Sequence, residues 1–237
     1  MALKRGAWHG LIALALLQPG MSHAAAETAA PSVVAAQIDN GPEAQSGLSE
    51  NAQLERIFAD EMRQGFALDP VGALQQGQRV SVEAFLQLFS PELAKARREA
   101  NAQVLARLRQ IKPGKLDEPH RLSREVLIDA KSADAALLQP DLLALTEVRP
   151  FNHFGGFHVS YPELSSPGSG IALETTSDYE LLIARHRVLG RVFDQATARF
   201  REGMASGVTE PRLTVDNMIA QIDALLAQPV ERSPFTS

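Results

Sequence analysis

Apolar residues recur every three or four positions along most of the chain, which is the spacing of one face of an α-helix. No segment alternates between apolar and polar residues for long enough to predict a strand. The helical segments predicted by this pattern run from about 54 to 68, 81 to 86, 91 to 112, 119 to 138, 177 to 206 and 213 to 227. We therefore predict an all-α fold of long antiparallel helices.

The longest predicted helix, 177–206, starts at an expected capping box of Ser177 and Glu180 and stops before Gly207, a typical left-handed cap. At 1.5 Å per residue it would be roughly 45 Å long. Its predicted buried stripe consists of Tyr179, Leu182, His186, Leu189, Phe193, Ala196, Phe200 and Met204. His186 is expected to be a hydrogen-bonded core residue. The last helix is expected to bury Val215, Met218, Ile222 and Leu225.

One segment, residues 149–176, interrupts the helical pattern and is predicted to be an irregular loop rich in aromatic residues and glycine. Its aromatic and histidine residues are Phe151, His153, Phe154, Phe157, His158 and Tyr161. Long loops inside helical proteins are more often functional than idle. The candidate substrate-contact residues are accordingly Asn152, His153, Phe154, Gly155, Gly156 and Phe157.

The N-terminal segment has the organisation of a secretory signal peptide. Lys4 and Arg5 precede the apolar run 11–17, and small residues around Ala24 offer a cleavage site. The run is too short to span a bilayer, which requires about 20 residues. We assign 1–24 to the signal peptide, 25–50 to a disordered linker and 51–237 to a helical domain. The general secretion route would deliver the protein to the periplasm or outside the cell, with no membrane span once the signal is removed.

Composition narrows the chemistry. The chain has 23 Lys and Arg against 28 Asp and Glu, a net charge of −5, and it lacks a basic block, so nucleic-acid binding is not expected. The absence of cysteine excludes disulfides and thiolate catalysis, and is consistent with export.

Residue spacing reveals no catalytic set. His153 and His158 are five residues apart, which does not place them on one helical face, and no acidic residue follows before Glu163. We expect these histidines to hydrogen-bond nearby carbonyl groups rather than to bind a metal. No catalytic or metal-binding residue is therefore predicted in this chain.

Several short segments follow one another in a recognisable order. They are Ser90-Pro91-Glu92 with Arg97-Arg98, the run 105–111 with Pro113, Pro150-Phe151-Asn152, Thr176-Ser177-Asp178-Tyr179-Glu180, Arg201-Glu202-Gly203 with Gly207, and Gln221-Ile222-Asp223-Ala224-Leu225-Leu226 with Pro229 and Ser233-Pro234-Phe235. Their order, from about Leu54 to Phe235, resembles the N-terminal half of the bacterial "domain of unknown function 885" family.

Members of that family are similar to helical, gluzincin-like zinc metallopeptidases, which implies an elongated all-α body with a deep cleft. Their zinc signature is a His-Glu pair followed by Pro-Gly-His-His, and none of the 6 histidines here precedes a glutamate. The resemblance therefore implies zinc for full-length members but no cofactor in this chain. It also implies a peptide-like substrate, and either a C-terminal half or a separate catalytic partner.

Three functions remain open at this point. The first is a non-catalytic N-terminal portion of an exported metallopeptidase-like hydrolase, forming a wall of its substrate cleft; this predicts exposed apolar surface. The second is an exported, non-enzymatic helical binding protein that uses the loop 151–161. The third, a complete small enzyme, is the least favoured because no catalytic constellation is present.

Overall fold

A computed structural model describes residues 47–165, 169, 171 and 173–232 of the protein. The expected signal peptide 1–24 lies outside these residues, as does the expected linker up to residue 46. Throughout the described part, the chain forms α-helices joined by loops and short 3-10 turns, with no strand. The all-α prediction is thus confirmed.

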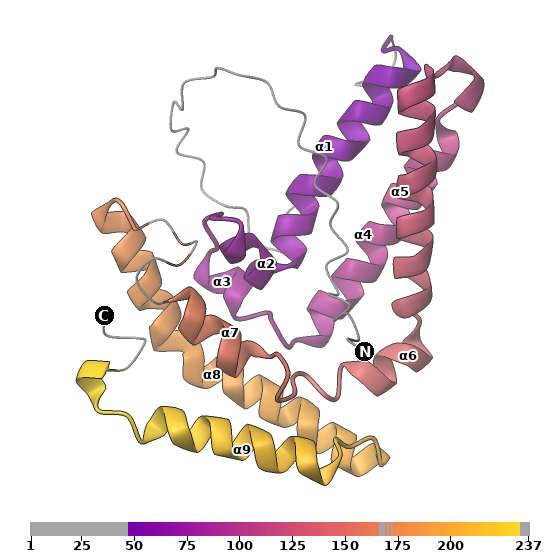
Figure 1. Cartoon of the computed structure of the whole chain (residues 1–237). Helices are drawn as coiled ribbons and strands as arrows, with labels where there is room; N and C mark the ends of the chain where they lie inside the picture. Colours follow the sequence, from indigo (N-terminus) through magenta and orange to yellow (C-terminus); the bar gives the residue numbers. More distant parts are fainter. Residues whose placement is uncertain (1–46, 166–168, 170, 172, 233–237) are drawn as a thin grey trace, which may run out of the picture.

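Three long helices form one antiparallel unit, seen at the upper right of Figure 1: α1 (Glu50–Leu68), α4 (Pro91–Gln110) and α5 (Glu118–Leu137). Contacts between helix ends establish the directions. Arg97 near the start of α4 donates to the Leu68 carbonyl at the end of α1 at 2.9 Å. Arg124 near the start of α5 donates to the Leu108 carbonyl near the end of α4, also at 2.9 Å. The unit encloses a core of Leu54, Ile57, Val104, Leu108, Ile111 and Leu116.

Partly buried ion pairs join the same three helices. Arg107 of α4 reaches Asp60 of α1 at 2.7 Å, and Lys131 of α5 reaches Glu61 of α1 at 2.6 Å. Burial opposes the charge on Lys131, but the hydrogen bond and charge of Glu61, with the charge of Asp134, more than offset this effect and raise the pKa of Lys131. The lysine therefore stays charged and continues to link α5 to α1.

A second unit surrounds an aromatic core. Its helices are α2 (Pro70–Gln75), α3 (Val82–Phe85), α7 (Phe157–Leu164) and α8 (Thr176–Ser206). Its buried residues are Ala73, Leu74, Val80, Ala84, Phe85, Phe157, Tyr161 and Val192. The remaining helices are α6 (Pro140–Thr146), which follows α5, and α9 (Arg212–Leu226), which lies along the lower edge of the molecule in Figure 1.

Two short helices, α2 and α6, are not predicted by the sequence pattern, and both begin with a proline. Pro70 follows Asp69, whose side chain accepts a hydrogen bond from the Gly72 amide. Pro140 occupies the first turn of α6. Proline stops a preceding helix, but its fixed φ also suits the first position of a new one. The proline that ends one helix here therefore starts the next.

The capping box of α8 lies two residues before the expected one. The N-cap is Thr175, whose hydroxyl accepts from the Asp178 amide at 3.3 Å, while the Asp178 carboxylate accepts from the Thr175 amide at 2.9 Å. Ser177 and Glu180 have the same spacing in the sequence and do not form the box. Gly207 does adopt the expected left-handed conformation, with φ of 78°.

The irregular segment 149–176 is partly helical, contrary to the prediction. Helix α7 occupies 157–164 and contains Pro162. It forms because Phe157 and Tyr161, one helical turn apart, are both buried in the aromatic core. Burial of these two rings outweighs the local preference of a glycine-rich, proline-containing sequence for a loop.

The faces of the last two long helices also differ from the prediction. Tyr179 and Met204, at the ends of the expected α8 stripe, are exposed, whereas Arg185 and Val192 are buried. On α9, Met218 is buried as expected, but Val215 and Ile222 are exposed. Among the described residues, no helix combines the length and apolarity that a bilayer crossing needs.

His120 provides a pH-dependent link between α1 and the start of α5. Its Nδ1 lies 2.6 Å from Asp117 and its Nε2 lies 3.0 Å from Glu55. The hydrogen bond to Glu55 and then that to Asp117 raise the pKa of His120. Because the folded state raises this pKa, protonated His120 contributes its full stabilisation at pH values below the ordinary histidine pKa. That contribution is lost as the pH rises through the raised pKa of the folded state.

We expect His120→Gln to have a lower free energy of unfolding than the wild type, with the largest difference at about pH 5 to 6. The difference should shrink towards about pH 8, where His120 loses its proton. Chemical denaturation across this range measures both proteins. Glu55→Gln serves as the partner control, because it removes one of the two carboxylates and should reduce the pH dependence. A difference that grows with pH would contradict the assignment.

Gly203 of α8 marks a close backbone crossing. A Cβ there would lie 2.5 Å from the Val208 carbonyl and 2.9 Å from the Val148 carbonyl, so a side chain cannot be added without moving backbone. We expect Gly203→Ala to lower the free energy of unfolding by about 1–3 kcal/mol.

Gly190 on the same helix is the matched control for that substitution, because a Cβ there would meet nothing within 4 Å. We expect Gly190→Ala to stabilise the protein by about 0.5–1 kcal/mol through its better helix propensity. Thermal and denaturant unfolding of the two variants measures the contrast. Equal effects would show that Gly203 is not at a crowded crossing.

Candidate functional site

A tight turn holds residues 152–155 of the candidate loop. The Asn152 side-chain oxygen accepts hydrogen bonds from the amides of Phe154 at 2.9 Å and Gly155 at 3.3 Å. The Asn152 amide also donates to the Gly155 carbonyl at 3.4 Å. Asparagine favours such turns because its side chain replaces a backbone acceptor. Asn152 and Gly155 therefore shape the loop, and its tip is an ordered turn.

The turn holds one large apolar side chain out in solvent. Phe154 is 89% exposed, and its ring lies against that of His153 with centroids 3.9 Å apart. Phe157, three residues later, is only 5% exposed and stacks on Tyr161 with centroids 5.1 Å apart. Of the two phenylalanines proposed to contact substrate, Phe154 is accessible in the isolated chain and Phe157 packs in the core.

Gly156 is required by a close contact rather than by its backbone conformation. A Cβ at this position would lie 2.4 Å from the Cβ of Phe151. The φ of Gly156 is 179°, which is ordinary extended backbone. Gly156 thus allows the chain to pass Phe151 as it enters α7, whereas a Cβ at Gly155 would meet nothing within 4 Å.

Gln221 of α9 connects the loop to two helices. Its side-chain amide nitrogen donates to the His153 carbonyl, and its oxygen lies near His158 Nε2, each at 3.0 Å. Because that oxygen is an acceptor, His158 must carry its proton on Nε2. Periodicity does not predict this role, since a glutamine on an amphipathic helix is ordinarily solvent-exposed. The one sequence signal is that Gln221 opens a segment that carries the family resemblance.

The two histidines do not form part of a metal site within the described chain. There, no group of three or more His, Asp or Glu side chains could hold a metal ion. His158 Nε2 is hydrogen-bonded to the Gln221 side-chain oxygen, and the ring centroids of His158 and Phe151 lie 4.9 Å apart. The side chains of the described ranges therefore do not fit the zinc that the family resemblance implies for full-length members.

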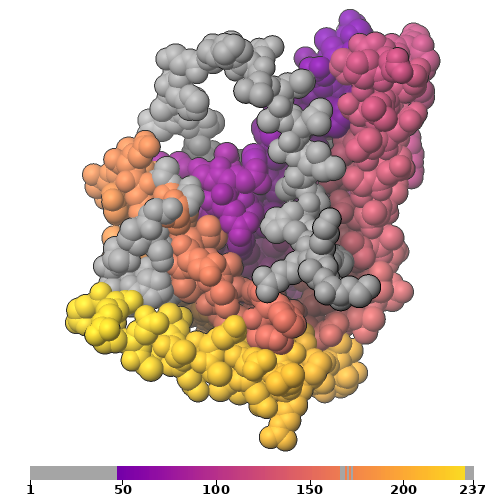
Figure 2. Space-filling model, viewed as in Figure 1, coloured from indigo at the N-terminus to yellow at the C-terminus, as the bar shows by residue number. Residues whose placement is uncertain are grey.

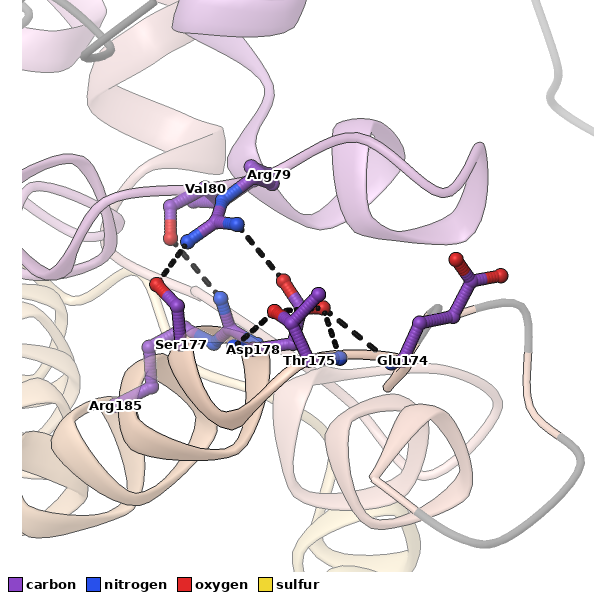
Figure 3. Close-up of polar contacts among 7 residues, drawn as sticks. All are labelled: Arg79, Val80, Glu174, Thr175, Ser177, Asp178 and Arg185. Carbon is purple, nitrogen blue, oxygen red and sulfur yellow. Dashed lines mark hydrogen bonds and ion pairs between the residues drawn. The ribbon is translucent and has the colours of Figure 1, made fainter. Parts of the chain in front are cut away.

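A second polar cluster, which the sequence does not predict, lies at the start of α8. Figure 3 shows Arg79 reaching the Ser177 hydroxyl at 2.9 Å and the Asp178 carboxylate at 2.8 Å. Hydrogen bonds from Thr175, together with the amide of Glu174 and the charge of Arg79, lower the pKa of Asp178. The cluster fastens the segment before α3 to the N-terminus of α8.

Arg185, about two helical turns further along α8, is a buried cation. It is 2% exposed and donates to the Val80 carbonyl at 3.0 Å. Burial lowers the pKa of Arg185, and burial with the Arg185 charge lowers the pKa of the neighbouring His186. His186 is half-buried and lies 3.4 Å from the Ser165 hydroxyl, and its ring meets Tyr161 edge-on at 5.6 Å. A charged arginine and a neutral histidine are therefore neighbours on α8.

The helical body matches a known bacterial family. A family model described as "Bacterial protein of unknown function (DUF885)" matches residues 70–237. The match covers the chain from α2 onward, including the candidate loop, α8 and α9. Neither a curated protein nor a solved structure matches the chain.

The contrast between the two loop phenylalanines is testable. Phe157→Ala should lower the free energy of unfolding by about 3–5 kcal/mol, because it leaves a cavity among packed rings. Phe154→Ala should change it by less than about 0.5 kcal/mol, because the ring is in solvent. Chemical denaturation followed by circular dichroism measures both variants. A large loss of stability in Phe154→Ala would show that this ring packs in the core.

Proposed function

The chain belongs to the DUF885 family of bacterial proteins, and on that premise we propose that it is the non-catalytic N-terminal portion of an exported metallopeptidase-like hydrolase. In this proposal its helices form one wall of the substrate cleft. Export rests on the signal-peptide pattern of residues 1–24, and the hydrolase class rests on the family resemblance. Zinc and the catalytic glutamate would come from a C-terminal half or a separate catalytic partner.

The observation that carries this proposal is the amount of apolar side chain left open on the outer helices. Helix α5 has no fully buried residue, although it is 20 residues long and amphipathic. The exposed apolar residues of the outer helices are Leu122, Val126 and Leu137 on α5, Leu142 and Leu145 on α6, and Leu213, Val215, Ile219, Ile222 and Leu226 on α9. Exposed apolar residues gathered along a helix in this way mark places where another structure packs.

The candidate loop fits an edge of a substrate cleft. Its turn is held by Asn152, its far end is anchored through Phe157, and Gln221 ties it to α9. Such anchoring keeps the exposed Phe154 and the adjacent His153 in a fixed position. An aromatic ring presented in this way suits contact with the apolar side chains of a peptide-like substrate.

The exposure of Phe154 also favours the alternative, an exported non-enzymatic binding protein that uses loop 151–161. The two functions differ in what they require of the outer helices. A self-sufficient binding protein has no need for open apolar faces on α5 and α9, so those faces favour the first proposal.

The test is the zinc content and peptidase activity of the native protein, captured from the periplasm or medium with an antibody to the α1 segment 50–68. We expect bound zinc and chelator-sensitive hydrolysis of peptides in the native material, and neither in the recombinant chain 25–237. Phe154→Ala introduced into the native protein should raise KM for peptides more than it lowers kcat, because the ring contacts substrate rather than the reacting atoms.

Three results would overturn the proposal. Native material without zinc and without peptidase activity would favour the binding-protein alternative. Peptide hydrolysis by the recombinant chain 25–237 would show that the chain is itself an enzyme. Unchanged KM in a folded Phe154→Ala protein would remove the loop from the substrate-binding surface.

A further inference from the structure

Helix α9 has one face that the body of the protein covers and a neighbouring apolar face that is open. The covered face carries Thr214, Met218, Gln221 and Leu225. These residues follow one another at intervals of four, three and four, which is one stripe of an α-helix. Gln221 in this stripe makes the hydrogen bonds to the candidate loop. This face therefore holds α9 to the rest of the chain.

The second face lies one residue further along and is open. It consists of Val215, Ile219, Ile222 and Leu226, hereafter the open seam. Ile219 is 52% and Leu226 76% exposed, whereas Val215 and Ile222 are each 36% exposed. The intervals are again four, three and four, but a step of one residue turns the helix by about 100°. The open seam thus lies beside the covered face, turned about a quarter of the way round the helix. Figure 2 shows α9 along the rim of the molecule.

The spacing of the open seam indicates the shape of what covers it. Alternating steps of three and four place apolar residues at the two core positions of a heptad repeat. That pattern forms a strip one helix wide. Another α-helix packs against such a strip with its axis inclined at about 20° to that of the first. A second helix is consequently the structure that matches the seam.

The charges beside the open seam indicate the chemistry of that helix. Asp216 and Asp223 each follow a seam residue, and both are exposed on the side away from the body. Asp216 lies 3.6 Å from the highly exposed Arg212, a weak surface pair. The opposite side of the seam is formed by Met218 and Leu225, which belong to the covered face. Arg212 lies on the same flank, so two carboxylates stand there against one guanidinium and the flank is acidic on balance. A complementary helix carries Lys or Arg opposite Asp216 and Asp223.

The same charges argue against two other occupants. A second copy packed antiparallel through its own seam would bring Asp216 of one chain near Asp223 of the other, and like charges at flanking positions oppose pairing. An anionic membrane surface attracts basic amphipathic helices rather than acidic ones.

We propose that the open seam of α9 is the docking surface for an amphipathic α-helix with basic flanking residues, contributed by the catalytic portion of the hydrolase. The assignment of that helix to a catalytic portion rests on the function proposed above. The recognition itself rests on the seam and its acidic flank. Docking there would place the added structure beside the loop, because the covered face of the same helix holds the loop through Gln221.

The test uses two fluorescein-labelled helical peptides of three heptads with Leu and Ile at the core positions. One peptide has Lys at all flanking positions and the other has Glu. Fluorescence anisotropy with the exported chain measures binding. We expect the Lys peptide to bind roughly tenfold more tightly at low salt, and the difference to narrow as salt is raised.

Two variants locate the binding on α9. Ile219→Lys with Ile222→Lys should abolish binding of the Lys peptide, with circular dichroism verifying that helix content is unchanged. Asp216→Lys with Asp223→Lys keeps the apolar seam and should reverse the preference in favour of the Glu peptide. This charge-reversed variant keeps the test decisive if the seam variant unfolds.

Several outcomes would overturn the inference: no binding of either peptide, equal binding of both, or an unchanged preference in the charge-reversed variant. Self-association of the chain that is lost in the seam variant would identify a second copy as the occupant. Binding of the seam to anionic vesicles would identify a membrane. None of these results depends on zinc or peptidase activity, so they leave the proposed hydrolase function to its own test.

Discussion

The aromatic cluster around Phe85 is the interaction on which the candidate site depends. The centroid of the Phe85 ring lies 5.3 Å from that of Phe157 and 4.9 Å from that of Tyr161. These contacts join α3 to α7. Phe151, at the other end of the loop, packs edge-on against Phe200 of α8 at 5.2 Å. Both ends of the loop are fixed by ring packing, and hydrogen bonds from the amides of Phe154 and Gly155 to the Asn152 side chain close the short turn between them. Exposure of Phe154 is thus a consequence of where its neighbours are buried.

The sequence predicted the helices well where local chemistry decides them. Ser90 caps α4 through its hydroxyl, which accepts from the Leu93 amide at 3.1 Å, and Gly207 ends α8 as its left-handed cap. It predicted α7 poorly, because the helix is held by burial of Phe157 and Tyr161 rather than by local propensity. Buried Arg185 and the hydrogen-bonding role of Gln221 were also missed. Each depends on a partner distant in the sequence, Val80 in one case and His153 in the other.

Periodicity predicted Val215, Met218, Ile222 and Leu225 as one buried stripe of α9, which mixes two residues of the covered face with two of the open face. A single helix with stripes one residue apart gives a merged apolar pattern, and only the fold separates them. Gln221 on the covered face of α9 holds the loop through the His153 carbonyl. In the proposed function, the loop that contacts substrate and the helix that receives the catalytic portion are therefore neighbours.

The most direct test of this account is native mass spectrometry of the protein captured from the periplasm or medium, where the proposed function places it. The account predicts a particle heavier than the 25.6 kDa of this chain, made up of the chain together with a covalently continuous or tightly bound catalytic portion. A particle with the mass of the signal-processed chain alone, or of two identical copies of it, would contradict the account.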